Sequence, residues 1–263
     1  MNPDYINEDN IKLFFSDPFA NEYSRYCSET IISAVAQIDA AFDYITGLVP
    51  PSRKDTVEEL RASLRSQTNK LMRAAVATRT LADAEPEMEA VDVDALVAYI
   101  CEQLSAKLGE KFTFKLRSRC NAFVCSDRRI ITDLMLGAVR KLLLSRKASH
   151  FVYYLGADDM GKNVRLYVND ATVDDEMNET GEQADMSDDE LFDRFFSCTN
   201  SAAADIIGAK SGYGGRLYTL ELPKYDPKDQ PSMLKSPVVY DQSRLAYTCR
   251  VMLDDEKLTR SGD

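Results

Sequence analysis

A regular spacing of apolar residues early in the chain constrains the fold most. Apolar side chains recur there in alternating steps of four and three residues, at Ile31, Val35, Ile38, Phe42 and Ile45. This spacing predicts a helix with one apolar seam. The prolines at positions 50 and 51 cannot continue a helix, so this one is expected to end before them.

A second helix is predicted directly after the prolines. Asp55 is a candidate N-cap, and Glu58, three residues later, completes a capping box. Only a glutamine and a threonine interrupt its seam, which comprises Val57, Leu60, Leu64, Gln67, Leu71, Ala74, Thr78 and Leu81. The two segments predict an antiparallel helical hairpin over residues 23–85, after an N-terminal lead over residues 1–22.

A single hairpin has too little surface to bury two apolar seams. Four-helix bundles supply the missing partners, most simply by two-fold pairing of identical hairpins. We therefore favour a homodimer. The alternative is that the hairpin packs against the rest of its own chain.

Residues 86–225 predict an α/β sandwich, a mixed sheet with helices on one face. Amphipathic helices are expected over residues 93–109, from Asp127 to Leu142, and over residues 201–209. Strands are expected at residues 112–116, 122–125, 151–155, 164–168 and 216–222. The chain is thus predicted to be α+β.

Residues 226–263 form a C-terminal extension with prolines at positions 227, 231 and 237. Strand-like character returns at residues 243–253. The extension could add a strand to the sheet edge, cover a cleft or reach a partner. The first option is favoured, because edge strands invite covering.

Composition excludes several classes of function. The net charge is −11, from 32 Lys and Arg against 43 Asp and Glu, which argues against nucleic-acid and anionic-membrane surfaces. Neither an apolar run of membrane-span length nor a signal sequence is evident, so the cytoplasm is the expected location. The six cysteines form no CxxC pair, and with one histidine in the chain neither a metal site nor a disulfide framework is expected. That histidine, His150, begins a predicted strand, and we interpret it as structural rather than as a catalytic base.

Five segments carry a resemblance to a known family. They are Val91–Val97, Val124–Ile130, Val164–Asp170, Leu191–Phe196 with its phenylalanines, and Tyr213–Leu217 with its glycine pair. Their order and spacing resemble the dimerisation and ATP-binding halves of bacterial sensor histidine kinases, over about residues 23–225. The resemblance implies a dimeric four-helix bundle followed by a histidine-kinase ATPase-like sandwich.

The same resemblance places the nucleotide-binding positions on residues that lack the family's chemistry. Two family asparagines fall on Gly137 and Lys141, and an ammonium cannot hold Mg²⁺. The first glycine motif reads Asp170-Ala171-Thr172-Val173-Asp174, and the second falls on residues 200–203, without glycine. Asp170 could still accept a hydrogen bond from adenine, Lys141 could contact phosphate, and Ser201 could donate to phosphate. Acidic residues at positions 185, 188, 189 and 190 would repel a triphosphate.

The phosphoacceptor position carries no histidine. The family's histidine and the acidic residue after it correspond to Ser28 and Glu29, and serine has no imidazole nitrogen to form a phosphoramidate. No catalytic residue is therefore predicted, and the chain is interpreted as a pseudokinase.

Three hypotheses follow. The first is a dimeric scaffold or regulator in bacterial two-component signalling that binds a response-regulator receiver domain or another kinase. By resemblance, the docking surface would comprise Ser24, Cys27, Ser28, Ile31 and Ile32. The second is a nucleotide sensor that binds ATP or ADP with Mg²⁺ through Asp170, Lys141 and Ser201 without autophosphorylation. The third is an enzyme phosphorylated at Ser28. The first implies no cofactor.

Overall fold

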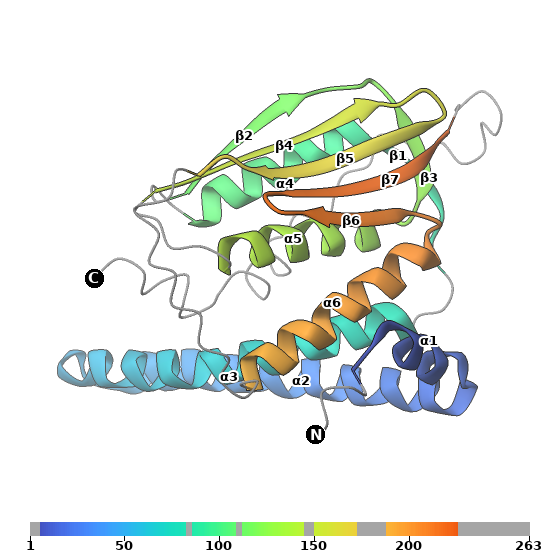
Figure 1. Ribbon diagram of the computed structural model, residues 1–263. Helices are drawn as coiled ribbons and strands as arrows, with labels where there is room; N and C mark the ends of the chain where they lie inside the picture. Colours follow the sequence, from blue (N-terminus) through green and yellow to red (C-terminus); the bar gives the residue numbers. More distant parts are fainter. Residues whose placement is uncertain (1–5, 83–85, 109–111, 145–149, 173–187, 226–263) are drawn as a thin grey trace, which may run out of the picture.

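The computed structural model describes residues 6–82, 86–108, 112–144, 150–172 and 188–225 (Figure 1). A long helical hairpin lies beneath a sandwich of one sheet and its covering helices. The predicted C-terminal extension, the motif positions Val173 and Asp174, and the acidic residue Asp185 lie outside the described residues.

The hairpin consists of α2 (Pro18–Leu48) and α3 (Lys54–Ala82), joined through the short 3-10 turn η2 (Pro51–Arg53). Helix α2 begins five residues earlier than predicted, because Asp17 accepts a hydrogen bond from the N–H of Ala20 at 2.9 Å and Pro18 suits the first helical position. The lead contains a further helix, α1 (Glu8–Ser16). The predicted N-cap Asp55 instead lies within the first turn of α3.

Within the hairpin, Val35 of α2 packs against Met72 of α3, with Ile31 and Ile32 beside them. The helices are antiparallel, as predicted. The seam predicted for α3 takes no part in this contact. Its residues Leu60, Leu64 and Leu71 are exposed on the surface of the single chain.

The predicted mixed sheet is confirmed. Its strands are β1 (Glu89–Asp92), β2 (Phe112–Ser118), β3 (Phe123–Ser126), β4 (Phe151–Asp159), β5 (Asn163–Asp170), β6 (Lys210–Gly214) and β7 (Leu217–Tyr225). They lie in the order β1-β3-β7-β5-β4-β2, and β6 also pairs with β7. The pair β2–β4 is parallel, and the other pairs are antiparallel.

Helices α4 (Val93–Leu108) and α5 (Arg128–Leu144) cover one face of this sheet (Figure 1). Alternate side chains of β4 and β5, such as Tyr153, Leu155 and Leu166, are fully buried in the resulting core. The residues that alternate with these in each strand point to the other face of the sheet.

Helix α6 (Asp188–Ile206) corrects the predicted boundaries. Where a helix starting at Ser201 was expected, one unbroken helix runs from Asp188, because residues 188–206 include neither glycine nor proline and contain three alanines at positions 202–204. It ends at Ile206 rather than at Ala209, because Gly208 adopts a positive φ of 66°. Helix α6 lies between the sandwich and the hairpin, in contact with α3, α1 and α5 (Figure 1).

By length and composition alone, α2 could cross a membrane, with a mean hydropathy of 1.2 over 18 residues. This stretch was not predicted from the sequence. This is weak evidence for a span, because core helices of soluble proteins and signal sequences meet the same criterion.

Candidate functional site

Ser28, the predicted phosphoacceptor-equivalent residue, is closed to solvent. It is 1% exposed, and its hydroxyl donates a 2.7 Å hydrogen bond to the backbone oxygen of Ser24, one turn earlier. Ser24, Ser28 and Val35 share a face of α2, and Val35 packs against α3. Ser28 therefore points into the hairpin, whereas Glu29 is exposed.

The residues of the predicted docking surface therefore differ in their exposure to solvent. Ser24 and Ser28 are buried and cannot contact a partner in this conformation, whereas Cys27, Ile31 and Ile32 are partly exposed. Tyr23 lies one helical turn before Cys27 on α2 and is 60% exposed. Sequence reasoning missed this tyrosine. Its spacing of four from Phe19 and three from Tyr26 could have revealed an aromatic helix face.

Asp170 ends β5 and is 2% exposed. Its Oδ1 accepts a hydrogen bond from the N–H of Thr172 at 2.9 Å, and its own N–H donates to the backbone oxygen of Arg216 at 2.8 Å. Oδ1 of the carboxylate at the predicted adenine-recognising position therefore caps its own chain.

Thr172, like Asp170, forms hydrogen bonds with residues distant in the sequence. Its hydroxyl accepts the N–H of Val152 at 3.1 Å, and its carbonyl accepts Nη1 of Arg216 at 2.8 Å. The N–H of Ala171 donates to the backbone oxygen of Val152 at 2.8 Å. Residues 170–172, where the first glycine motif begins, are thus attached to β4 and to the turn between β6 and β7.

Lys141 projects from α5 toward an aromatic pair. Its Nζ lies 4.0 Å from the ring centroid of Tyr213, whose ring lies 4.7 Å from that of Tyr218. Burial raises the pKa of both tyrosines, so they stay neutral at physiological pH. The Lys141 ammonium therefore has a cation–π partner within the chain.

Ser201 lies in the C-terminal half of α6, so its backbone N–H belongs to a continuous helix. The carboxylate of Glu8 on α1 accepts hydrogen bonds from Lys12 and from the Ser201 hydroxyl, and both lower the pKa of Glu8. Asp170, Lys141 and Ser201 therefore each have a different partner: the N–H of Thr172, the ring of Tyr213 and the carboxylate of Glu8.

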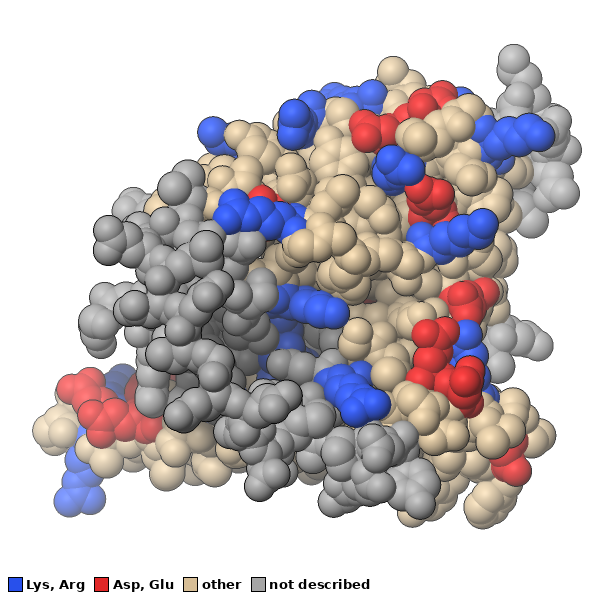
Figure 2. All heavy atoms as spheres, viewed as in Figure 1, with Lys and Arg blue, Asp and Glu red and all other residues tan. Residues whose placement is uncertain are grey.

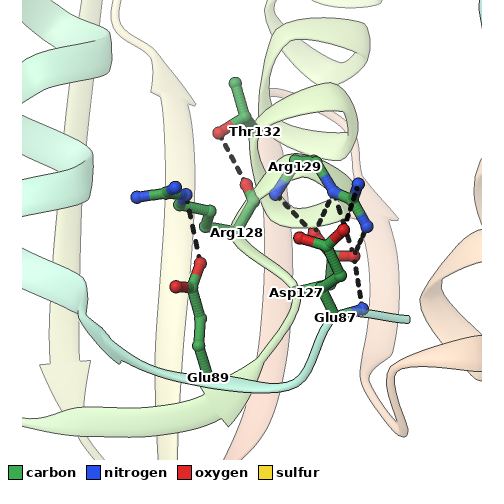
Figure 3. A network of polar contacts seen from close by, with 6 residues as sticks. All are labelled: Glu87, Glu89, Asp127, Arg128, Arg129 and Thr132. Carbon is green, nitrogen blue, oxygen red and sulfur yellow. Dashed lines mark hydrogen bonds and ion pairs between the residues drawn. The ribbon is translucent and has the colours of Figure 1, made fainter. Parts of the chain in front are cut away.

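Asp127 anchors the segment that joins the hairpin to the sandwich (Figure 3). Its carboxylate accepts the backbone N–H of Glu87 and of Arg129, each at 2.9 Å, and Nη2 of Arg129 at 2.5 Å. Glu89 pairs with Arg128 at 3.1 Å. Burial by itself would raise the pKa of Asp127, but these hydrogen bonds outweigh it and hold the pKa below its usual range.

No protein-family model matches the sequence, and no curated protein matches it either. Solved structures do. Full-length ShkA in complex with AMPPNP aligns with a TM-score of 0.51 at 16% identity, over 74% of this chain and 46% of that one. The chain has a histidine-kinase-like fold. This chain thus spans less than half of ShkA.

Two further histidine kinases with this fold align less well. AdeS from Acinetobacter baumannii gives a TM-score of 0.47 at 16% identity, over 76% of this chain and 96% of that one. ThkA, in complex with the response regulator protein TrrA, gives 0.44 at 16% identity, over 77% of this chain and 60% of that one.

The residues present do not fit a magnesium-bound triphosphate in the manner that the fold implies. Lys141 is a cation, and α6 passes unbroken through the second glycine position. In the described ranges no cluster of three or more His, Cys, Asp or Glu side chains is placed to bind a metal ion.

Proposed function

We propose that this chain is a catalytically degenerate, histidine-kinase-like scaffold or regulator in bacterial two-component signalling, acting in the cytoplasm by protein–protein contact. The observation that carries the proposal is the state of Ser28. A phosphoacceptor must present a nucleophile to the γ-phosphate, and here the position bears a buried hydroxyl bonded to the carbonyl of Ser24.

The nucleotide-site positions support the same proposal. Asp170 is engaged by the N–H of Thr172, and Lys141 lies over Tyr213. The absence of glycine at positions 171–174 and 200–203 makes a close approach of backbone to phosphate costly. The scaffold of a kinase therefore persists without the groups that would bind and transfer phosphate.

We propose that the active form is a homodimer. The hairpin exposes five large apolar side chains that belong to the two predicted seams: Ile38, Ile45, Leu60, Leu64 and Leu71. An apolar stripe of this length on one hairpin matches the interior of a four-helix bundle formed with a second copy.

The proposed partner is a receiver domain or another kinase that contacts the exposed part of α2. Cys27, Ile31 and Ile32 contribute partly exposed apolar surface, and Tyr23 adds an exposed ring next to Cys27. Aromatic side chains are enriched among the residues that dominate interface affinity.

Binding to purified receiver domains encoded in the same genome tests this proposal. We expect at least one receiver domain to bind, and Tyr23→Arg to weaken that binding. The matched control is Tyr44→Arg, since Tyr44 is a similarly exposed tyrosine, 68% exposed, at the other end of α2. Failure of the folded dimer to bind any receiver domain or kinase would contradict the proposal.

A thermal-shift titration with ATP and Mg²⁺ separates the scaffold from the nucleotide-sensing alternative. A ligand present at about 100 times its Kd stabilises a protein by about 2.7 kcal/mol. We expect no shift at millimolar nucleotide. A saturable shift that Asp170→Asn removes would favour the nucleotide sensor instead.

A further inference from the structure

The face of the sheet that points away from α4 and α5 is rich in basic residues. On β2, Phe112 and Phe114 are buried beneath the helices, whereas Lys115 and Arg117 are exposed. The same alternation places Arg165 of β5 and Lys210 of β6 on this face, and the register sets both beside Glu221 of β7.

This surface has the opposite charge to the chain as a whole. Lys115, Arg117, Arg165 and Lys210 face outward, against Asp158 and Glu221, in a chain of net charge −11. Figure 2 shows Lys and Arg side chains spread over the upper part of the molecule, where the sheet lies, with Asp and Glu side chains among them.

The ion pairs and hydrogen bonds on this outer face of the sheet leave a net positive charge at strand β2. Arg165 is neutralised by Glu221 at 2.6 Å, and Asp158 accepts the hydroxyl of Ser118 at 2.8 Å. The guanidinium of Arg117 lies 5.5 Å from the ring centroid of Tyr154. Within the described part of the chain, neither Lys115 nor Arg117 has a carboxylate partner.

Strand β2 also lies at the edge of the sheet. Within the described ranges it pairs only with β4, so its outer backbone groups can accept another extended chain. Side chains on one face of a strand recur every second residue, roughly 7 Å apart. Carboxylates at alternate positions of an added strand would therefore match the spacing of Lys115 and Arg117.

We propose that the β2 edge and its basic face bind an acidic, extended polypeptide segment with Asp or Glu at alternate positions. The partner adds a strand to β2, and its carboxylates pair with Lys115 and Arg117. A polypeptide suits this surface better than nucleic acid, because a strand added to β2 is held by backbone N–H and C=O groups that nucleic acid does not have. This inference goes beyond the proposed function, because the hairpin plays no part in it.

Fluorescence anisotropy of short labelled peptides, measured with the full chain, tests the proposal. We expect a peptide of alternating Thr and Glu to bind, and its Thr–Lys counterpart not to bind. The double variant Lys115→Glu/Arg117→Glu should weaken binding by roughly tenfold, since it replaces two ion pairs with two repulsions. Both residues are exposed, so the fold should persist.

The matched control is Arg53→Glu/Lys54→Glu, which makes the same charge change at exposed positions of the hairpin turn. It should leave the affinity for the Thr–Glu peptide unchanged. Equal loss in both double variants, or no binding of the peptide at all, would overturn the proposal. Equally tight binding of single-stranded oligo-dT at Lys115 and Arg117 would replace a polypeptide partner with nucleic acid.

Discussion

Two side chains at positions predicted by resemblance to carry kinase chemistry have hydrogen-bond partners inside the chain. The Ser28 hydroxyl donates a hydrogen bond to the backbone oxygen of Ser24, and the Asp170 carboxylate accepts one from the N–H of Thr172. Both residues were singled out by resemblance, and the partners of their side chains could not be predicted from the sequence. Ser28 continues the seam of Ile31 and Val35 backward by three residues, so its spacing indicates an inward position, although its polar side chain does not.

Burial makes Ser28 sensitive to added charge. Ser28→Asp places a carboxylate without a partner at a position that is 1% exposed, and we expect it to lower the free energy of unfolding by about 3 kcal/mol. Urea denaturation measures this. Glu29→Gln, one residue away but exposed, should change the stability by less than about 0.5 kcal/mol. Equal effects of the two substitutions would show that Ser28 is accessible.

Asp127 should make stability depend on pH at the acidic end. Its folded pKa lies below the ordinary aspartate value of about 3.9, so its stabilisation is complete above that value and is lost as the pH falls through the folded pKa. Asp127→Asn should therefore be destabilised relative to the native chain at pH 7, and the difference should shrink toward pH 3. Denaturation curves across this range test it, with the exposed Asp9→Asn as control. A constant difference would contradict a depressed pKa.

At the scale of elements, apolar periodicity predicted where the helices lie in the sequence better than it predicted what each helix packs against. The seam through Leu60, Leu64 and Leu71 was correctly identified as an apolar stripe, but it lies on the surface of the single chain. The buried side of α3 instead includes Asn69 and Arg73, whose polarity hid it from a pattern based on apolar residues. Periodicity does not distinguish a face that packs within the chain from one that packs against another chain.

The exposed seam should determine the oligomeric state. Leu64→Glu adds a carboxylate to the stripe, and we expect it to convert a dimer to a monomer in light scattering coupled to size-exclusion chromatography. Burying that charge in a bundle would be costly, whereas Leu64 is already 43% exposed in the single chain. Tyr44→Glu, also at an exposed apolar position of the hairpin, should leave the dimer intact. A monomeric native chain, or a dimeric Leu64→Glu variant, would contradict the bundle.

Helix α6 shows a second limit of sequence reasoning. Residues Leu191–Phe196 and a helix over residues 201–209 were predicted as separate segments, and the resemblance places its second glycine motif at residues 200–203. The alanines at positions 202–204 carry no turn signal and are buried. The helix propensity of these residues therefore outweighs the turn that the resemblance implies. Helix α6 continues through the position where a phosphate-binding turn was expected.

At the scale of the whole molecule, two sets of contacts among the described residues connect the hairpin and the sandwich. Helix α6 contacts α3 and α1, with Lys12 paired to Asp205 at 2.5 Å, and Asp127 holds the segment that enters the sandwich. The hairpin, the helical cover and five strands of the mixed sheet could be predicted from alternation and from 3.6-residue periodicity, whereas strands β1 and β6 were not predicted. The contact of α1 with α6 could not, because it depends on tertiary packing of a segment predicted only as a lead.

The central claim is that this kinase-like framework transfers no phosphate. Incubation of the purified chain with γ-labelled ATP and Mg²⁺, followed by detection of protein-bound label, tests it most directly. We predict no label on the chain, in the native form or in Ser28→Ala. Label that accumulates on the native chain with time and disappears in Ser28→Ala would contradict the claim.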